Sequence, residues 1–178
     1  PLAGGGRRDG IAGIPQGSDA AATAAACSAA PAVGVRSLAA EGSEHVKLDA
    51  DFTGKTFTRI DQSIAMGALF TAHHLGAKAI VAMTDSGSTA LWMSRHLIHV
   101  PIYALTPKVS TQRKMTLYRN VQPLLMDTAN DRDTALAQAE AHLKARGIVQ
   151  KGDVYAITCG EPMGSPGGTN MLKICRVE

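Results

Sequence analysis

Short apolar runs recur along the chain from residue 79 onward, and polar or turn-forming residues separate them. Four of these runs have the length of a typical strand and are too short for a typical helix. They are Ala79–Thr84, Ile102–Thr106, Val121–Met126 and Val154–Cys159. Near-continuous apolar character of this kind predicts strands that are buried on both faces of a sheet.

Segments with apolar residues at helical spacing lie between these predicted strands. The predicted helices are Ser88–Leu97, Ser110–Tyr118 and Asp131–Arg146. The last is the clearest, because Asp131 and Asp133 stand in its first turn and Gly147 follows its basic end.

One further helix is predicted before the first strand. Thr58 is expected to cap its N-terminus, with Asp61 three residues on as in a capping box. The apolar residues at near-helical spacing are Ile64, Ala68, Ala72 and Leu75. Gly76 is expected to end the helix as a left-handed cap.

Strands that alternate with helices predict an α/β fold of three layers, αβα, around a mostly parallel five-stranded sheet. The fifth strand is expected at Met171–Val177. Only a loop joins it to the strand at Val154–Cys159, and this loop is too short to hold a crossover helix. We therefore expect an antiparallel C-terminal edge strand.

Residues 1–42 differ in composition from the rest of the chain and show neither helical nor strand periodicity. Gly4–Arg8 and Ala20–Ala26 are strongly biased toward glycine, arginine and alanine. We expect this segment to be poorly ordered, either as a flexible linker or as a product of out-of-frame translation of GC-rich DNA. The folded domain is predicted to comprise residues 43–178.

Charge and cysteine content narrow the function classes. The formal net charge is only +3 and no dense run of lysine and arginine occurs, so a nucleic-acid partner is not favoured. The three cysteines include no CxxC pair, so neither a disulfide framework nor a metal site is expected. No apolar run approaches the roughly 20 residues that span a bilayer. We expect a cytoplasmic protein without membrane or nucleic-acid partners.

The first candidate site is the segment 84–89, which follows the first predicted strand and is called the cradle below. Ligands of open parallel sheets bind at the carboxyl ends of the strands, and hydroxyl groups with a flexible glycine suit a phosphate group. The candidate ligands are Thr84, Ser86, Gly87, Ser88 and Thr89. The alternative is ordinary helix capping, but a cap needs one hydroxyl and this segment has four.

The second candidate is the glycine-rich segment 160–170, which joins the last two predicted strands. It lacks the GxGxxG order and precedes a strand, so a dinucleotide site is not favoured. We expect a loop that folds over a ligand in the cradle, and the alternative is a wide connection without a binding role. The residues assigned to this loop are Gly160, Glu161, Gly164, Ser165, Gly167 and Gly168.

Other reactive residues carry less weight, and no catalytic residue is assigned. His73 and His74 fall in the last turn of a predicted helix, where cations are favoured, so capping outranks catalysis. Cys159 is better explained as a buried apolar residue than as a nucleophile, because no base is identifiable. Trp92 is expected to pack rather than to stack on a base. The sequence contains no GxxxxGK[ST], HExxH or GxSxG motif.

Four motifs in order resemble the C-terminal domain of bacterial pyruvate kinases, over about Ser43–Glu178. They are Arg59-Ile60-Asp61, the run from Val81 to Ala90, the run from Tyr118 to Pro123, and Gly168-Thr169-Asn170. Each motif alone is weak, whereas their joint occurrence in this order is highly specific.

The resemblance implies one domain of a glycolytic enzyme that transfers phosphate from phosphoenolpyruvate to ADP. In that family the reaction takes place on a separate TIM barrel with Mg²⁺ and usually K⁺, and no residues of this sequence match the barrel's motifs. We therefore expect this chain to be inactive by itself and to bind no cofactor. The family's C-terminal domain contributes subunit contacts in a tetramer, so a homo-oligomer is implied. It also binds a sugar-phosphate or nucleotide effector. By resemblance, the cradle binds the effector phosphate and the segment from Gly160 to Gly168 is the effector loop.

Two departures from the family pattern bear on the effector. Asp85 is acidic where some fructose-bisphosphate-responsive members have a basic residue, and Glu161 stands in a loop without the Trp and Arg that bind a second phosphate in such members. These carboxylates would repel a second phosphate. We therefore expect a sugar monophosphate, such as glucose 6-phosphate or ribose 5-phosphate, or AMP.

Three function hypotheses follow. The leading one is a regulatory and subunit-assembly domain of pyruvate kinase. The second is a free-standing phosphometabolite-binding module without kinase activity. The third is a small thiol enzyme that uses Cys159, and a Cys159→Ser variant separates it from the other two.

Overall fold

The structure, a computed structural model, describes residues 56–127, 131–163 and 168–178. The predicted low-complexity segment 1–42 and the predicted domain boundary at residue 43 lie outside these residues.

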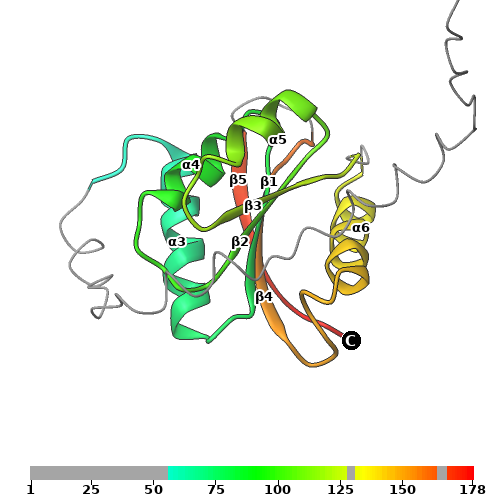
Figure 1. The fold of residues 1–178 in the computed structure, drawn as a ribbon. Coiled ribbons are helices and arrows are strands. Elements are labelled where there is room, and N and C mark those ends of the chain that lie inside the picture. Colours follow the sequence, from blue (N-terminus) through cyan, green and yellow to red (C-terminus); the bar gives the residue numbers. More distant parts are fainter. Residues whose placement is uncertain (1–55, 128–130, 164–167) are drawn as a thin grey trace, which may run out of the picture. The chain divides into compact units, whose positions relative to one another are not determined.

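Helices and strands alternate along the described chain (Figure 1). The elements are α3 (Ile60–His74), β1 (Ala79–Met83), α4 (Ser88–Ser94), β2 (Ile102–Thr106), α5 (Val109–Met115), β3 (Val121–Leu125), α6 (Arg132–Ala145), β4 (Val154–Gly160) and β5 (Thr169–Arg176). The five strands form one sheet in the order β3-β2-β1-β4-β5. The first four are parallel and β5 is antiparallel to β4, so the predicted fold class is confirmed.

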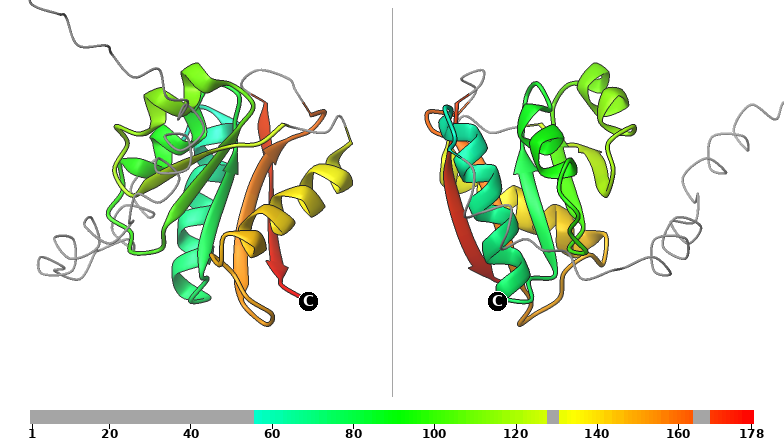
Figure 2. Two further views of the ribbon diagram at one scale, coloured as in Figure 1. Left: turned by 45° about the vertical axis from the view of Figure 1, so that its right-hand side comes forward. Right: turned by 90° about the vertical axis from the view of Figure 1, so that its left-hand side faces the viewer.

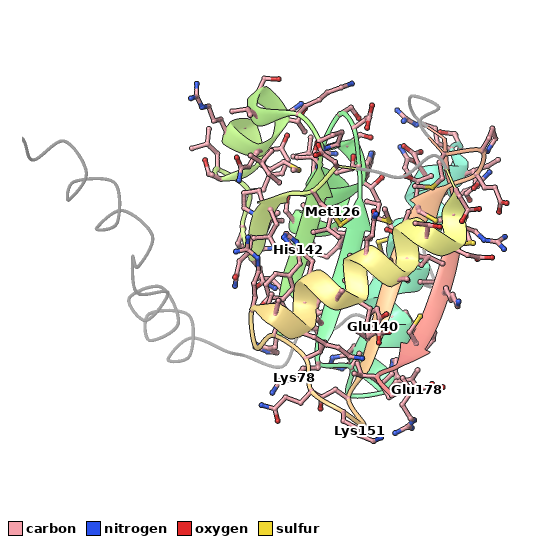
Figure 3. All side chains as sticks on the ribbon, turned by 90° about the vertical axis from the view of Figure 1, so that its right-hand side faces the viewer. Lys78, Met126, Glu140, His142, Lys151 and Glu178 are labelled. Atoms are coloured by element: carbon pink, nitrogen blue, oxygen red, sulfur yellow. The ribbon has the colours of Figure 1, made fainter. Side chains whose placement is uncertain are left out.

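Two apolar cores cover the two faces of the sheet, because successive side chains of a strand point to opposite faces. Ile80 and Ala82 of β1 belong to the core under α3 and α4, whereas Val81 and Met83 belong to the core under α6. Figure 1 shows α3 and α6 on opposite sides of the sheet, and Figure 3 shows α6 lying across its own face. The result is the expected three-layer αβα arrangement.

The edge strand β3 departs from the prediction of burial on both faces. All residues of β1 and β2 are buried, but β3 buries only Val121 and leaves Gln122 and Leu125 exposed. A strand at the edge of the sheet has a neighbouring strand on one side only, and β3 pairs with β2 alone. Burial on both faces was therefore wrong for β3, although the strand itself is present.

The N-terminus of α3 also differs from the predicted capping box. Arg59, not Thr58, is the N-cap residue, and no side chain caps the helix. The buried Asp61 carboxylate instead accepts two hydrogen bonds from the Arg59 guanidinium and one from the Gln62 N–H. The acidic residue of the first turn is thus held by an ion pair, and the helix begins one residue later than its predicted cap implies.

The predicted ends of two helices are confirmed. Gly76 has a φ of 61°, in the left-handed region, and its N–H donates to the carbonyl oxygen of His73 at 3.2 Å. Asp131 caps α6 by accepting from the Thr134 N–H at 2.9 Å, and Gly147 follows the helix with a φ of 66°. The hydrogen bond from Thr134 also lowers the pKa of the Asp131 carboxyl.

Candidate functional site

The cradle is a tight turn between β1 and α4 that folds onto itself. The hydroxyl of Thr84 accepts from the Gly87 N–H at 2.9 Å. Gly87 is the N-cap of α4 and has a φ of 79°, a conformation that other residues adopt only at a cost. Gly87 has no side chain to cap α4, and the Ser86 hydroxyl accepts from the Ser88 N–H in the first turn of the helix at 3.4 Å. One hydroxyl of the cluster thus serves the helix N-terminus, as the capping alternative expects.

The four hydroxyls of the cradle fall into an outer pair and an inner pair. Ser86 is exposed and Ser88 is half-buried, and the Ser86 hydroxyl donates to the Ser88 hydroxyl at 3.1 Å. Thr84 and Thr89 are buried, and Thr89 Oγ1 lies 2.8 Å from Thr169 Oγ1. The outer pair is the one that a ligand in solution reaches first.

Helix α5 forms a second wall beside the cradle, which the sequence reasoning missed. Lys108 Nζ donates to Asp85 Oδ2 at 2.9 Å, and Lys114 Nζ donates to the Ser86 carbonyl oxygen at 2.7 Å. The Thr111 hydroxyl donates to the Asp85 carbonyl oxygen at 2.8 Å. Figure 2 shows α5 at the end of the sheet where β1 and β2 finish.

A sequence signal for this wall existed in the prediction of parallel strands. The carboxyl ends of parallel strands meet at one edge of a sheet, and β1 and β2 pair in register from Ile80 with Ile102 to Met83 with Leu105. This pairing brings the residues that follow β2 near those that follow β1, although the sequence reasoning did not draw that consequence. The sequence did not say which side chains of the later helix would turn toward the cradle.

The base of the glycine-rich loop is fixed by three contacts. Asn170 binds both main-chain groups of Glu161: its Oδ1 accepts from the N–H at 2.9 Å and its Nδ2 donates to the carbonyl oxygen at 2.7 Å. The Glu161 carboxylate accepts from Arg132 Nη1 at 3.2 Å through each oxygen. A Cβ on Gly160 would lie 2.7 Å from the carbonyl oxygen of Gly168, so glycine is required at this close approach.

The described part of the loop therefore includes Gly160, Glu161 and Gly168, whereas Gly164, Ser165 and Gly167 lie outside the described residues. The strand β4 ends beside β1, and Thr169 reaches Thr89. Both predicted segments thus meet where the parallel strands β1 and β4 end.

The two carboxylates expected to repel a second phosphate each have a cationic partner. Asp85 pairs with Lys108, and Glu161 pairs with Arg132. The hydrogen bonds that the Arg132 guanidinium donates to the Asp133 and Glu161 carboxylates raise its pKa above the usual range. The negative charge on these two residues is therefore partly compensated in the structure, which the sequence reasoning did not anticipate.

The side chains set aside from the sequence take ordinary structural positions. Cys159 is fully buried, and burial, together with the nearby Glu161 carboxylate, raises the pKa of its thiol. His73 and His74 are exposed in the last turn of α3. Trp92 is half-buried against the core, and the Arg95 guanidinium lies 4.5 Å from its ring centroid.

The described residues contain no group of three or more His, Cys, Asp or Glu side chains placed to hold a metal ion. Among the helices of the same residues, none is long and apolar enough to cross a membrane.

The sheet order, the antiparallel edge strand and the hydroxyl-rich turn after β1 together define an α/β domain with a candidate anion site at the carboxyl edge of its sheet. The family described as "Pyruvate kinase, alpha/beta domain" matches residues 62–175. The chain belongs to this family, and the resemblance inferred from the sequence motifs is confirmed.

Individual relatives agree. The chain is 39% identical over 122 residues to the pyruvate kinase of Buchnera aphidicola, 68% of this chain and 25% of that protein. It is 38% identical over 131 residues to the pyruvate kinase of Staphylococcus aureus, 74% of this chain and 22% of that protein. A crystal structure of a pyruvate kinase from Cryptosporidium parvum matches with a TM-score of 0.62 at 24% identity, over 70% of this chain and 24% of that one, and shows the same fold.

The chain thus spans about a quarter of the length of the relatives it matches.

Proposed function

We propose that this chain is the regulatory and subunit-assembly domain of a pyruvate kinase, in which the cradle binds the phosphate of an effector. The observation that carries the proposal is the convergence of hydroxyl and ammonium groups at one edge of the sheet. The exposed Ser86 hydroxyl, the half-buried Ser88 hydroxyl and the Lys114 ammonium group gather there. Hydroxyl and ammonium donors are the groups that bind phosphate oxygens.

The effector is proposed to be a sugar monophosphate or AMP. Asp85 occupies the edge of the cradle, and a second phosphate group placed there would compete with its carboxylate for Lys108. The hydroxyl groups of a sugar, in contrast, can donate hydrogen bonds to a carboxylate. The charge pattern therefore supports a ligand with one phosphate and several hydroxyls.

The assembly role has separate support. Strand β5 lies at the edge of the sheet and pairs only with β4 in the described structure. Such an edge leaves main-chain groups open to another strand. Large apolar side chains that are exposed nearby in the fold include Ile60 and Phe70 of α3, its C-cap residue Leu75, and Ile174 of β5. Exposed apolar groups of this kind support contacts with a second copy of the chain.

A thermal-shift experiment tests effector binding. Glucose 6-phosphate, ribose 5-phosphate, AMP and fructose 1,6-bisphosphate are added in turn, with inorganic phosphate as the reference anion. At a free concentration of 100 times Kd, a bound ligand stabilises the folded state by about 2.7 kcal/mol. This corresponds to a rise in melting temperature of roughly 5 to 10 °C for a domain of this size. If none of the ligands shifts the melting temperature, the effector proposal is wrong.

Two variants of Ser86 give matched controls. Ser86→Asp puts a fixed carboxylate where the phosphate belongs and is expected to abolish the shift. Ser86→Ala removes the hydroxyl without adding charge and is expected to weaken binding only severalfold. If a ligand raises the melting temperature of wild type and Ser86→Asp equally, the hydroxyl cluster has a structural role and does not bind the phosphate.

A further inference from the structure

We infer that the effector site extends beyond the cradle to helix α5 and its N-cap residue Lys108. Lys114 binds the effector phosphate, whereas Asp85 holds Lys108 in an ion pair, which restricts the ligand to one phosphate group. The inference rests on the proposed function of the cradle as an effector site. It adds residues outside the segment 84–89 and assigns each a separate role.

Three hydrogen bonds fix α5 against the cradle. Two of them reach main-chain carbonyl groups: the Thr111 hydroxyl donates to Asp85 at 2.8 Å and Lys114 Nζ donates to Ser86 at 2.7 Å. The third is the ion pair of Lys108 with the Asp85 carboxylate at 2.9 Å. Behind them, a Cβ on Gly87 would lie 3.0 Å from Met115 Cγ, so the helix and the turn are already in close contact. The ammonium groups of Lys108 and Lys114 therefore both lie at the turn.

Lys114 is the group with unused binding capacity. Its ammonium group has three N–H donors, of which the Ser86 carbonyl oxygen takes one. Lys114 is exposed, and among the described residues it forms no ion pair, in contrast to Lys108, Arg132 and Lys144. Because Ser86 bears both this anchoring carbonyl and the exposed hydroxyl, a phosphate on the hydroxyl lies within reach of the ammonium group.

Lys108, in contrast to Lys114, already forms an ion pair. Its partner is the carboxylate of Asp85, whose side chain is 30% exposed. A second phosphate could bind the Lys108 ammonium group only if it displaced the Asp85 carboxylate, and the two negative charges would repel each other. Removal of the carboxylate should therefore release a second cation to the site. This asymmetry between the two lysines is the basis of the proposed selection for monophosphates.

The test measures Kd by calorimetry for the full 178-residue chain with glucose 6-phosphate, ribose 5-phosphate and AMP separately. Lys114→Met is expected to raise the Kd of the ligand that binds wild type by about tenfold or more, since a charge-assisted contact is lost. Lys114→Arg keeps the charge and is expected to retain most of the affinity. The wild-type Kd should rise with added KCl, and the Lys114→Met value should rise less.

Lys151→Met is the matched control. Lys151 is an exposed lysine in the turn before β4, and Figure 3 shows it at the end of the sheet opposite to α5. The substitution makes the same change in net charge and is expected to leave Kd unaltered. Melting temperatures without ligand verify that both variants fold.

Asp85→Asn tests the second half of the inference. It should lower the Kd of fructose 1,6-bisphosphate by roughly tenfold relative to wild type, because Lys108 becomes available. In the Lys114→Met background it should also restore part of the monophosphate affinity. The inference is overturned, while the proposed function stands, if wild type and Lys114→Met bind the monophosphate with equal Kd. The same holds if Lys114→Met and Lys151→Met have equal Kd. Failure of all ligands to bind wild type overturns both.

Discussion

The hydroxyls of Thr89 and Thr169 lie 2.8 Å apart in the interior, although 80 positions separate them in the sequence. Thr89 stands in the first turn of α4 and Thr169 begins β5, so the contact joins the cradle to the base of the glycine-rich loop. One hydroxyl must donate and the other accept. If a phosphate oxygen accepts from Thr89, Thr169 becomes the donor to Thr89, so the pair links ligand binding to the start of β5.

We expect Thr169→Val to destabilise the domain by roughly 1 to 2 kcal/mol, because the buried Thr89 hydroxyl then lacks its partner. The double variant Thr89→Val/Thr169→Val removes both hydroxyls at similar volume and should cost less than the sum of the single changes. Urea unfolding of the four proteins gives the coupling free energy. Strict additivity would show that the hydrogen bond contributes nothing.

Gly87→Ala should cost more stability than Gly76→Ala. Both glycines are in the left-handed region, where a Cβ costs roughly 1 to 2 kcal/mol. A Cβ on Gly76 meets no atom within 4 Å, whereas one on Gly87 lies 3.0 Å from Met115 Cγ and 3.2 Å from its Sδ. The difference between the two melting temperatures therefore measures the packing of α5 on the cradle. Equal losses would mean that Met115 moves aside freely.

Cys159 should be unreactive in the folded protein. Its thiol is fully buried, and the raised pKa reduces the thiolate fraction that reacts with disulfide reagents. In a variant with Cys27 and Cys175 changed to Ser, labelling by a chromogenic disulfide should require denaturant. Because the pKa of the Cys159 thiol is raised in the folded state, its contribution to the free energy of unfolding is fully present below the ordinary thiol pKa. This contribution is lost as the pH rises through the raised pKa. Fast labelling without denaturant would revive the thiol-enzyme hypothesis.

His142 of α6 should make the domain less stable in mild acid (Figure 3). Its Nδ1 is buried without a hydrogen-bond partner among the described residues, and burial together with Arg146 lowers the pKa of the imidazole below 6.5. A lowered folded-state pKa means that the stability is present above pH 6.5 and is lost as the pH falls. Urea unfolding at pH 7.0 and 5.5 should show a smaller loss for His142→Leu than for wild type. Parallel losses would exclude this residue as the cause.

Local signals were sufficient for most of the fold. The fully buried five-residue strand at Ile102–Thr106 was predicted with its observed bounds, and the acidic start of α6 and the left-handed glycine that follows it were confirmed. The short connection after β4 was enough to predict the antiparallel edge strand. These features depend on the chemistry of a few consecutive residues, which the sequence contains in full.

The tertiary structure decided which distant side chains meet at the candidate site. The strand order places β1 between β2 and β4, and this brings α5 to one side of the cradle and Thr169 to the other. The same order left β3 exposed at an edge, against the prediction of burial. Nothing in the local pattern of α5 identifies Lys114 as a neighbour of Ser86. The helical period of 3.6 residues shows which face of the helix is apolar, but it does not show which loop lies beside the polar face.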